Sequence, residues 1–496
     1  KTLTREWRLG QLLALQRLIV EGRDELCEAM RADLHKSHFE GFSIELGVIE
    51  AEVRTALTNL DDWMKPKHTS TSGLNFPASS STQQDALGVV LIMGAWNYPM
   101  QLLFAPLVGA IAGGNCVVLK PGAYAPVCSH TISRLVQKYL DPECIKVAEG
   151  DRTVTAALLE QRFDKICFTG SGFVGKLVLS AAAKHLTPCL LELGGKSPAI
   201  IDRSADLEHA SRRLVWGTFT NAGQTCVRPD FCLIHADVAD EFLKLTKKAI
   251  IEFYGQDPQQ TEWFGRLING AATKRVAGLV DACKSRIYCG GHVDLDNKYV
   301  EPTILDYGSD LRTFMASEAM QDEIFGPLLP CARYTDLEEV LNLIKELPTG
   351  KPLALYAFSK DESMIQAVKT RTTSGACVVN DCLMHLANHE LPFGGVGASG
   401  MGSYHGHRSF LAFTHEKAIL RKFASVDQLP GLKQLLGARF PPYTPAKQTI
   451  IKLFSQAIVE TLVNVHRRPL FTPLIFIVVL WYTMCALGMR IRITWD

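Results

Sequence analysis

The sequence predicts an α/β protein with parallel sheets, because short apolar segments alternate with helical stretches of roughly 10–15 residues over most of its length. The segments are continuous apolar runs rich in β-branched residues, which is typical of parallel strands that are covered on both faces. The length of 496 residues is enough for about three domains. Hydrophobic residues make up 47% and charged residues 21%, a balance that excludes a disordered or fibrous chain.

The first 65 residues are expected to be helical. Apolar side chains recur at helical spacing between charged residues, at Leu12, Leu15, Ile19, Leu26 and Met30 among others. A further helical stretch is expected from about residue 42 to residue 64. The polar, Ser- and Thr-rich segment 69–84 then predicts a linker or an edge ribbon, not a part of the core.

The alternation of strands and helices begins at Gly88. Strands are predicted within the segments 88–94, 116–121, 144–150, 165–171 and 188–195. A second α/β series starts near Ser197, with strands expected in 197–202 and 231–236, a helix over 206–221, and further elements to about residue 388. Residues 392–406 contain six glycines, which predicts a loop that turns tightly or approaches a partner closely.

Charge and cysteine content exclude several classes of partner. The 52 basic and 51 acidic residues leave a net charge of +1, which gives no footprint for nucleic acid. The 14 cysteines contain no CxxC pair, so we expect neither a metal site nor a disulfide framework, and free thiols facing the cytosol. No secretory signal peptide is visible. Because the chain begins at Lys1 and not at Met, we expect a few residues to precede it.

The C-terminal segment predicts a membrane anchor. Residues 470–489 form a run of twenty residues without a charge, about 30 Å long as a helix, and we place a transmembrane tail anchor at 469–489. Two arginines flank the segment on each side, so the distribution of positive charge does not set its orientation in the membrane. The free cysteines set it instead, because they favour a reducing compartment, and we expect the bulk of the chain to face the cytosol. A buried core helix, or an apolar peptide docked on a partner, is the alternative. Residues 446–468 predict an amphipathic helix on a membrane surface or over a groove.

A glycine motif indicates a nucleotide site. GSGFVG, from Gly170 to Gly175, matches GxGxxG, follows a predicted strand and opens a predicted helix, which is the context that gives the pattern meaning. The alternative is a tight turn without a ligand. About twenty residues further on stands Glu192, where this pattern expects an acid that binds the ribose.

Three polar side chains at the ends of elements indicate a reactive crevice. Cys226 lies in NAGQTC after a predicted helix, Glu192 follows an apolar strand in LLELGGKS, and Asn97 follows the first strand in GAWNYP. Ligands of parallel sheets bind at the carboxyl ends of the strands, where these side chains can meet. On its own, Cys226 would be a small core residue.

Six motifs resemble the aldehyde dehydrogenase superfamily. They are GAWNYP, LELGGKS, FTGSxxxGK, NAGQTC, DEIFGP and LPFGGVGxSGMGxYHG, in this order, and the resemblance runs from about Leu9 to His415. It is greatest to the class 3 branch and, within it, to fatty aldehyde dehydrogenases that carry a hydrophobic C-terminal anchor. The anchor segment is similar to theirs in position and length, not in residues.

The resemblance implies the chemistry of the site. It makes Cys226 the nucleophile, Asn97 an oxyanion donor, and Glu192 the general base, not a ribose ligand. A thiolate would add to the aldehyde to give a thiohemiacetal, hydride would leave to give a thioester, and water activated by Glu192 would release the acid. Burial in an apolar strand would raise the pKa of Glu192 as such a base requires.

The resemblance also implies NAD or NADP as cofactor. Lys120 in LKPG would contact the adenosine ribose, Glu323 in DEIFGP would bind the nicotinamide ribose, and Phe325 would pack beside the nicotinamide. The helix after the glycine motif would not grip the pyrophosphate as in ordinary dinucleotide folds, although the motif would still lie on the cofactor through Gly170, Ser171 and Gly175. A solvated lysine and a surface salt bridge are the alternatives for Lys120 and Glu323.

One departure from the family concerns cofactor choice. Where relatives usually have KPSE or KPAE, with an acid that binds the adenosine ribose, this chain has Lys120-Pro121-Gly122-Ala123. The missing acid predicts that NADP is accepted alongside NAD. Arg228, two residues after Cys226, could lower the pKa of the thiol, but we favour a surface or interface role for it.

These inferences together predict a domain plan. We expect an NAD(P)-binding domain of residues 1–74 and 88–196, a catalytic domain of residues 197–391, and a small β element of residues 75–87 and 392–445 that bridges two subunits. A homodimer is expected because the family forms dimers.

The expected function is NAD(P)-dependent oxidation of medium- to long-chain aliphatic aldehydes to carboxylic acids. An anchored enzyme would draw on substrates that partition into the bilayer, with about 0.8 kcal/mol gained per methylene. We expect the endoplasmic reticulum membrane, with other intracellular membranes as alternatives. The alternative functions are a tethered dehydrogenase for short-chain or aromatic aldehydes, a catalytically idle scaffold, and an enzyme that releases its thioester to CoA.

Overall fold

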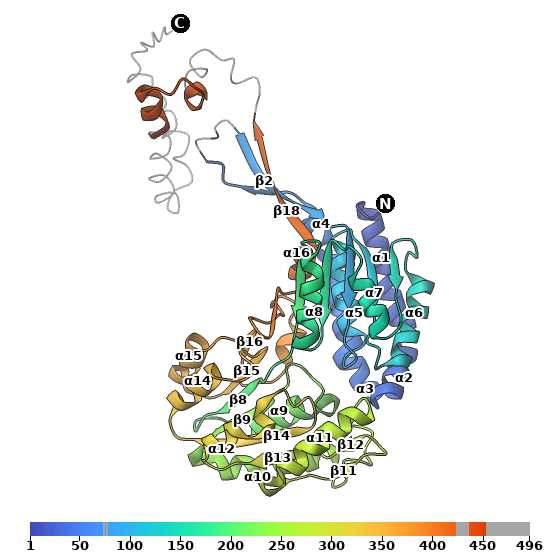
Figure 1. Ribbon diagram of the computed structural model, residues 1–496, viewed down its shortest axis with the longest axis vertical. Coiled ribbons are helices and arrows are strands. Elements are labelled where there is room, and N and C mark those ends of the chain that lie inside the picture. Colours follow the sequence, from blue (N-terminus) through green and yellow to red (C-terminus); the bar gives the residue numbers. More distant parts are fainter. Residues whose placement is uncertain (73–74, 76–77, 423–435, 453–496) are drawn as a thin grey trace. The chain divides into compact units, whose positions relative to one another are not determined.

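The computed structural model describes residues 1–72, 75, 78–422 and 436–452 (Figure 1). The chain divides into two compact units. The main unit consists of Lys1–Trp63 and Asp85–His415, and the small unit of Met64–Gln84 and Glu416–Asp496. Every predicted site residue belongs to the main unit.

The N-terminal part of the main unit is helical, as predicted. Its elements are α1 (Arg5–Glu21), α2 (Arg23–Leu34), α3 (His38–Glu40), the π-helix η1 (Gly41–Leu46) and α4 (Gly47–Met64). The side chains that recur at helical spacing, such as Leu12, Leu15 and Ile19, are fully buried, and burial of each contributes about 1.5–3 kcal/mol. The stretch predicted as a plain helix from residue 42 instead starts with the π-helix.

The first sheet of the main unit has six strands in the order β17-β7-β6-β3-β4-β5, and all pairs except β17 with β7 are parallel. Its strands are β3 (Val89–Met93), β4 (Cys116–Lys120), β5 (Ile145–Val147), β6 (Lys165–Thr169), β7 (Cys189–Glu192) and β17 (Gly400–Met401). The helices that alternate with them are α5 (Gln101–Ala112), α6 (Pro126–Tyr139), α7 (Arg152–Leu159) and α8 (Gly172–Ala183). The parallel sheet predicted from the apolar runs is confirmed.

The short strand β17 was not predicted, because the glycine-rich segment 392–406 was expected to be a loop throughout. Gly400 pairs with Glu192 and Met401 with Leu191. Gly400 has φ of 141°, and a Cβ there would collide with the carbonyl oxygen of Leu191. Glycine therefore does not prevent the strand here but permits its close approach to β7.

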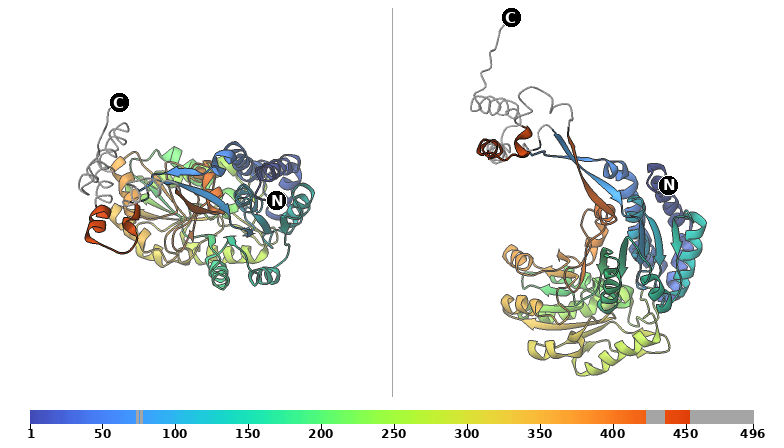
Figure 2. Two further views of the ribbon diagram at one scale, coloured as in Figure 1. Left: turned by 90° about the horizontal axis from the view of Figure 1, so that it is seen from above. Right: turned by 45° about the horizontal axis from the view of Figure 1, so that its top comes forward.

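The second sheet has seven strands in the order β10-β13-β14-β9-β8-β15-β16, parallel except for β10. Its strands are β8 (Pro198–Ile201), β9 (Phe231–His235), β10 (Ile287–Cys289), β13 (Thr303–Asp306), β14 (Leu328–Tyr334), β15 (Ala354–Phe358) and β16 (Ala376–Val379). The helices around it are α9 (Leu207–Phe219), α10 (Ala239–Tyr254), α11 (Gly270–Ala282), α12 (Leu311–Ala316), α13 (Glu318–Gln321), α14 (Leu337–Lys345) and α15 (Glu362–Arg371). Figure 2 shows the second sheet and its helices, together with the first sheet and its helices, from two further directions.

The small unit contains a three-stranded sheet in the order β1-β2-β18, made from β1 (Lys67–Thr69), β2 (Ala78–Ala86) and β18 (Thr414–Lys422). Residues 78–84 of the polar segment lie in β2, which is the central strand of this sheet, whereas a linker or an edge ribbon was predicted. Among the described residues, no helix combines the length and the apolar character needed to cross a membrane. The anchor predicted at 469–489 lies outside the described residues. So does the predicted amphipathic helix after residue 452, while residues 446–452 are helical.

Candidate active site

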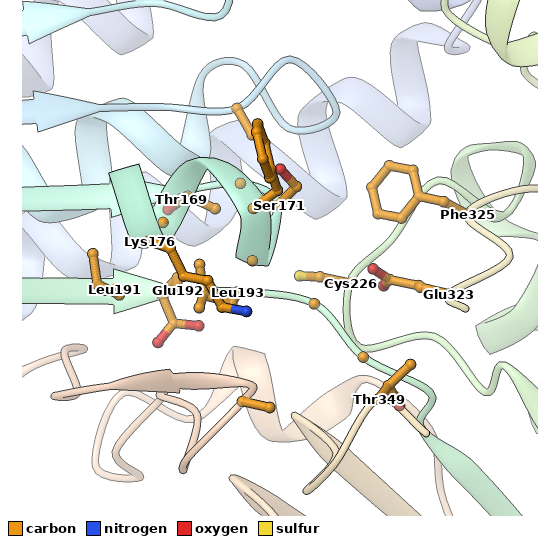
Figure 3. A pocket seen from close by; sticks show the side chains of 18 of the residues that line it. Thr169, Ser171, Lys176, Leu191, Glu192, Leu193, Cys226, Glu323, Phe325 and Thr349 are labelled. Atoms are coloured by element: carbon orange, nitrogen blue, oxygen red, sulfur yellow. The ribbon is translucent and has the colours of Figure 1, made fainter. Parts of the chain in front are cut away.

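A cavity of about 740 Å³ opens in the main unit at the carboxyl ends of β3, β6 and β7 (Figure 3). Parallel sheets bind their ligands at this edge. Eight of the nine predicted site residues line the cavity, namely Asn97, Gly170, Ser171, Gly175, Glu192, Cys226, Glu323 and Phe325. Lys120 is the exception.

Cys226 is held by a loop with an unusual backbone. After α9 ends, Asn221, Ala222 and Gly223 all have positive φ, at 56°, 51° and 74°. A Cβ on Gly223 would collide with the carbonyl oxygen of Gly326, so only glycine fits at this point. Three left-handed residues in succession turn the chain sharply and aim the thiol into the cavity, which is a form of strain that is typical of functional sites.

Burial is the main cause that raises the pKa of the Cys226 thiol, followed by the negative charges of Glu323 and Glu192. The backbone N–H groups of Cys226 and Val227 act in the opposite direction. The same N–H groups favour negative charge on the sulfur.

Asn97 lies against the cysteine loop. Its Nδ2 donates a hydrogen bond of 3.0 Å to the carbonyl oxygen of Gln224. The next residue along, Tyr98, shares a hydrogen bond of 2.6 Å with Thr225. The loop after β3 and the loop that carries Cys226 are thus joined at two successive positions, and both are almost fully buried.

Glu192 is the last residue of β7 and lies between β6 and β17 in the sheet. Its side chain is buried, and neither carboxylate oxygen has a hydrogen-bond partner among the described residues. Burial raises its pKa well above the usual value. A carboxyl group that is buried without a partner beside a cavity is costly for the fold, which marks a functional group more than a structural one.

Glu323 and Phe325 lie on the loop between α13 and β14. Burial is the first cause that raises the pKa of Glu323, followed by the charge of Asp230, and Glu323 Oε1 has no hydrogen-bond partner among the described residues. Figure 3 shows its carboxylate next to Cys226. Phe325 has φ of 44°. Its ring packs against the Trp96 ring edge to face, and the two ring centroids are 5.5 Å apart.

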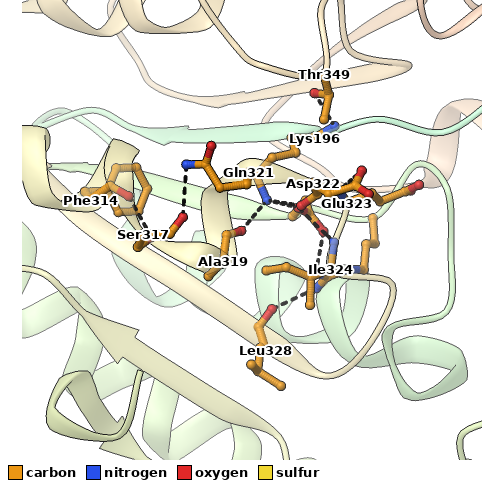
Figure 4. A network of polar contacts seen from close by, with 12 residues as sticks. Lys196, Phe314, Ser317, Ala319, Gln321, Asp322, Glu323, Ile324, Leu328 and Thr349 are labelled. Atoms are coloured by element: carbon orange, nitrogen blue, oxygen red, sulfur yellow. Dashed lines mark hydrogen bonds and ion pairs between the residues drawn. The ribbon is translucent and has the colours of Figure 1, made fainter. Parts of the chain in front are cut away.

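A buried ion network fixes this loop (Figure 4). Lys196 pairs with Asp230 and donates hydrogen bonds to the carbonyl oxygens of Ala319, at 2.7 Å, and Asp322, at 3.1 Å. Asp230 in turn accepts a hydrogen bond of 3.2 Å from the backbone of Ile324. Each charge has a partner, as buried charges require, so the residues on both sides of Glu323 are held in place.

Arg228 belongs to the same network, and the favoured expectation of a surface or interface role is wrong. Its side chain is 1% exposed and donates to Asp230, at 2.5 Å, and to the carbonyl oxygen of Leu328, at 3.1 Å. The guanidinium group therefore forms a buried ion pair with Asp230, which lies two residues further along the chain. It is also not among the causes that shift the pKa of Cys226, which is raised and not lowered.

The glycine motif forms the turn between β6 and α8 on the cavity wall. Ser171 caps α8, because its hydroxyl accepts a hydrogen bond from the backbone of Val174. Gly175 allows α8 to lie close to the strand, since a Cβ there would come within 2.7 Å of the Leu193 side chain. The motif thus lines the cavity, and its contact with a cofactor stays a prediction.

Lys120 ends β4 but does not line the cavity. Its Nζ donates a hydrogen bond of 2.7 Å to the carbonyl oxygen of Pro121, and its side chain is buried. Burial lowers its pKa. The solvated lysine that was the alternative is therefore not found, and contact with a ribose remains a prediction that requires Nζ to turn away from Pro121.

Sequence reasoning missed several residues on the cavity wall, including Trp96, Lys176, Arg275, Thr349 and Met401. Trp96 and Lys176 stand inside the quoted motifs GAWNYP and FTGSxxxGK and could have been found there. Arg275 and Thr349 lie far from any motif, and only the fold brings them to the site.

The cavity fits a dinucleotide. Its volume lies in the range of about 300–1,000 Å³ that is usual for ligand sites. Glu323 Oε1 is a buried acceptor without a hydrogen-bond partner among the described residues, which suits a ribose hydroxyl. A Cβ on Gly172 would meet no atom within 4 Å, so the wall at the glycine motif leaves room for the ligand.

Comparison with known proteins gives the same result. The profile of the aldehyde dehydrogenase family matches residues 1–419. The 4,4'-diaponeurosporen-aldehyde dehydrogenase of Staphylococcus aureus is 42% identical over 448 residues, which cover 90% of this chain and 94% of that protein. Aldehyde dehydrogenase family 3 member B1 of Rattus norvegicus is 42% identical over 444 residues, covering 90% of this chain and 92% of its own length.

Solved structures agree with these relatives. The substrate-bound state of Staphylococcus aureus AldH superimposes with a TM-score of 0.87 at 41% identity, and the match covers 92% of this chain and 96% of that one. The chain therefore belongs to the aldehyde dehydrogenase family, in its class 3 branch, and is an enzyme that oxidises aldehydes with NAD or NADP.

Proposed function

We propose that the chain oxidises medium- to long-chain aliphatic aldehydes to carboxylic acids through a covalent intermediate on Cys226. The observation that carries this proposal is that Cys226, Asn97 and Glu192 line one cavity, and that neither Glu192 carboxylate oxygen has a hydrogen-bond partner among the described residues. They supply a nucleophile, an oxyanion donor and a base, which are the groups that the oxidation of an aldehyde through a thioester needs.

In the first step the Cys226 thiol gives up its proton to solvent. The resulting thiolate adds to the aldehyde carbon, and the carbonyl oxygen takes up the electron pair. The Asn97 amide and the backbone N–H of Cys226 stabilise the oxyanion, and one such donor is typically worth about 3 kcal/mol. NAD or NADP, when bound, would supply the nicotinamide that accepts a hydride, and loss of the hydride from this carbon would leave a thioester on Cys226.

In the second step Glu192 removes a proton from water, and the resulting hydroxide attacks the thioester carbon. The C–S bond breaks, the carboxylic acid leaves, and the Cys226 thiolate is restored. Burial, which raises the pKa of Glu192, makes its carboxylate a stronger base once it is deprotonated. The backbone N–H of Gly395 favours the charged form of this carboxylate, and neither oxygen makes a hydrogen bond of good geometry among the described residues, so an oxygen can accept a hydrogen bond from the attacking water.

The proposal of an aliphatic substrate rests on partition into a bilayer. A hydrocarbon gains about 0.8 kcal/mol for each methylene that it removes from water. The uncharged run at 470–489 supports the same conclusion from the sequence, because a tail anchor in the endoplasmic reticulum membrane would hold the enzyme where such aldehydes collect. A homodimer bridged through the small unit completes the proposal.

The cofactor proposed is NAD, with NADP accepted alongside it. Ala123 stands where family members usually carry an acid, and its side chain is exposed. Without a carboxylate at this place, a 2′-phosphate meets no like charge from that position.

NADH formation by the purified full-length chain tests the proposal, with aldehydes from hexanal to octadecanal and both cofactors. We expect kcat/KM to rise with chain length and Cys226→Ala to abolish turnover while NAD still binds. A preference for acetaldehyde or benzaldehyde would favour the short-chain or aromatic alternative, and turnover that requires CoA would contradict hydrolysis by Glu192.

Truncation after Pro445 tests the C-terminal helix: an unchanged profile across chain lengths would show that it does not border the substrate entrance.

A further inference from the structure

Three buried charged side chains of the N-terminal helical segment lie against the two loops of the active site. They are Lys36, Glu40 and Glu45, between α2 and α4. Lys36 and Glu45 are fully buried, and Glu40 is 9% exposed. Buried charges are rare unless they pair or serve a function, so what each of these groups contacts is informative.

The backbone of this segment explains why these side chains reach the loops. His35 has a positive φ of 57° and ends α2, so that Lys36 turns inward. The chain then continues through α3 into the π-helix η1, in which hydrogen bonds join residues five apart. The wider turn brings Glu40 and Glu45 nearer to one face than an α-helix would, and π-helical turns occur often at functional sites.

Lys36 binds directly to the residue proposed as oxyanion donor. Its Nζ donates a hydrogen bond of 2.8 Å to the backbone carbonyl oxygen of Asn97 and pairs with Glu45 at 2.6 Å. The same ammonium group lies over the Tyr98 ring, 4.1 Å from its centroid. The lysine therefore contacts both the carbonyl group of Asn97 and the side chain of the next residue, Tyr98.

The two glutamates hold the remaining parts of the two loops. Glu45 Oε2 accepts hydrogen bonds from the backbone N–H groups of Met100, at 2.9 Å, and Gln101, at 3.2 Å, and so caps the start of α5. Glu40 Oε1 accepts a hydrogen bond of 2.8 Å from the backbone of Asn221, the first of the three left-handed residues before Cys226.

A second donor supports the same carbonyl of Asn97. The side chain of Asn221 donates to it at 2.8 Å, so this oxygen receives one hydrogen bond from each side. One N–H of the Asn97 amide is used by Gln224, and no described residue accepts its other N–H. The arrangement fixes the backbone of Asn97 and leaves one amide proton for the oxyanion.

We propose that Lys36 is a positioning residue: with Glu45 behind it, it holds the Asn97 peptide so that the Asn97 amide points at the developing oxyanion. The inference deepens the proposed function and rests on it. Lys36 reaches no reacting atom itself, and its effect passes through Asn97. Displacement of a transition-state donor by a fraction of an ångström is costly, because the donor must be in place before the charge develops.

The test measures the single-turnover rate of NADH formation from hexanal at saturating NAD, in the full chain. We expect Lys36→Met to slow this rate about tenfold to a hundredfold, with the Kd for NAD unchanged. The double variant with Asn97→Ala is expected to be no slower than Asn97→Ala alone, because the lysine acts through that amide.

Arg8→Met is the matched control. Arg8 is a buried cation of the same helical region, on α1, and donates to the carbonyl oxygens of Ala112, at 2.9 Å, and Leu3, at 3.2 Å, away from the cavity. We expect it to keep the wild-type rate. Should Lys36→Met fail to fold by circular dichroism, Asn221→Gly takes its place. Glycine accepts the positive φ, and the substitution removes the second donor to the Asn97 carbonyl together with the hydrogen bond of 3.2 Å from the same side chain to the carbonyl oxygen of Gln224.

Three results would overturn the inference: a wild-type rate in the folded variant, slowing that adds to that of Asn97→Ala, or an equal loss in Arg8→Met. Failure of the proposed function is seen elsewhere, in a wild-type enzyme that forms no NADH from hexanal or in a Cys226→Ala variant that still does.

Discussion

Tyr98 and Thr225 share a buried hydrogen bond of 2.6 Å across 127 positions of sequence. One follows Asn97 directly and the other precedes Cys226 directly, so a single contact couples the residues proposed as oxyanion donor and nucleophile. Burial raises the pKa of Tyr98 well above the usual value, which keeps its hydroxyl neutral and able to donate. The geometry of the site is therefore set by contacts between loops, and the predictions below depend on that geometry.

Glu323→Gln is expected to make the Cys226 thiol more acidic. After burial, the charge of Glu323 is the largest cause that raises the pKa of Cys226, so the neutral amide leaves more thiolate at a given pH. We expect alkylation by iodoacetamide at about pH 9 to be roughly threefold to tenfold faster, because one pKa unit changes the thiolate fraction about tenfold.

The sign of this effect can be checked through its pH dependence. Because the pKa of Glu323 is itself raised by burial, its charge acts only where it is ionised, and the difference between variant and wild type should widen as pH rises. The exposed Glu318→Gln on the preceding helix is the control and should alkylate like the wild type. Equal rates at every pH would contradict the prediction.

Glu192→Gln is expected to separate the two chemical steps. Hydride transfer does not need the base, so a burst of NADH should appear, equal to the amount of enzyme. Hydrolysis should then be slowed about a hundredfold or more, since general base catalysis contributes that much. Mass spectrometry of the stalled enzyme should show the acyl group on Cys226. A steady rate like that of the wild type would mean that another group activates the water.

The same substitution should alter stability in a pH-dependent way. The pKa of Glu192 is raised above its usual 4.5 by burial, so the folded state binds this proton more tightly than the unfolded chain. The stability from this group is complete below about pH 4.5 and is lost as pH rises toward the folded-state pKa. Glu192→Gln should therefore raise Tm at about pH 8 but not at about pH 4. The exposed Glu241→Gln should show no such difference.

Much of the fold could be predicted because apolar strand runs and helical spacing are local signals. The strand before Asn97 and the strand that ends at Glu192 were placed correctly, and the motif around Cys226 identified a cysteine that lines the cavity. The small strand β17 was missed because glycine content argues against strands in general. At Gly400 a strand forms because the residue is glycine: a Cβ at this position would collide with the carbonyl oxygen of Leu191 on the neighbouring strand.

Lys36 and Glu45 could not be predicted as residues that support the active site, because a charged side chain in a helical stretch is normally expected to face solvent. Neither residue lies in a recognised motif, and their burial depends on the left-handed turn at His35 and on the π-helix. Arg228 was misjudged for the same reason: its partner Asp230 is obvious only when both are seen to be buried. Such pairings depend on tertiary packing, which one sequence does not reveal.

Gly223→Ala is expected to inactivate the enzyme. The residue has φ of 74°, and an added Cβ would collide with the carbonyl oxygen of Gly326, on the loop next to Phe325. Backbone strain of this kind costs about 1–3 kcal/mol, and its relief would displace the Cys226 loop. We expect at least a tenfold fall in kcat and a lower Tm. Gly278→Ala, in helix α11 with open space around it, should instead stabilise the chain by about 0.5–1 kcal/mol. Equal effects would show that the turn is not special.

Ala123→Glu is expected to restrict the enzyme to NAD. The position is exposed, and an acid there would face the adenosine ribose in the proposed binding mode. A carboxylate close to a 2′-phosphate repels it, whereas it can accept hydrogen bonds from the two ribose hydroxyls of NAD. We expect kcat/KM for NADP to fall about tenfold to a hundredfold while that for NAD stays the same or rises. Ala123→Gln has the same size without the charge and should reduce NADP use much less. If both substitutions act alike, the effect is steric. If the wild-type kcat/KM for NADP is already a thousandfold below that for NAD, the missing acid does not determine cofactor choice.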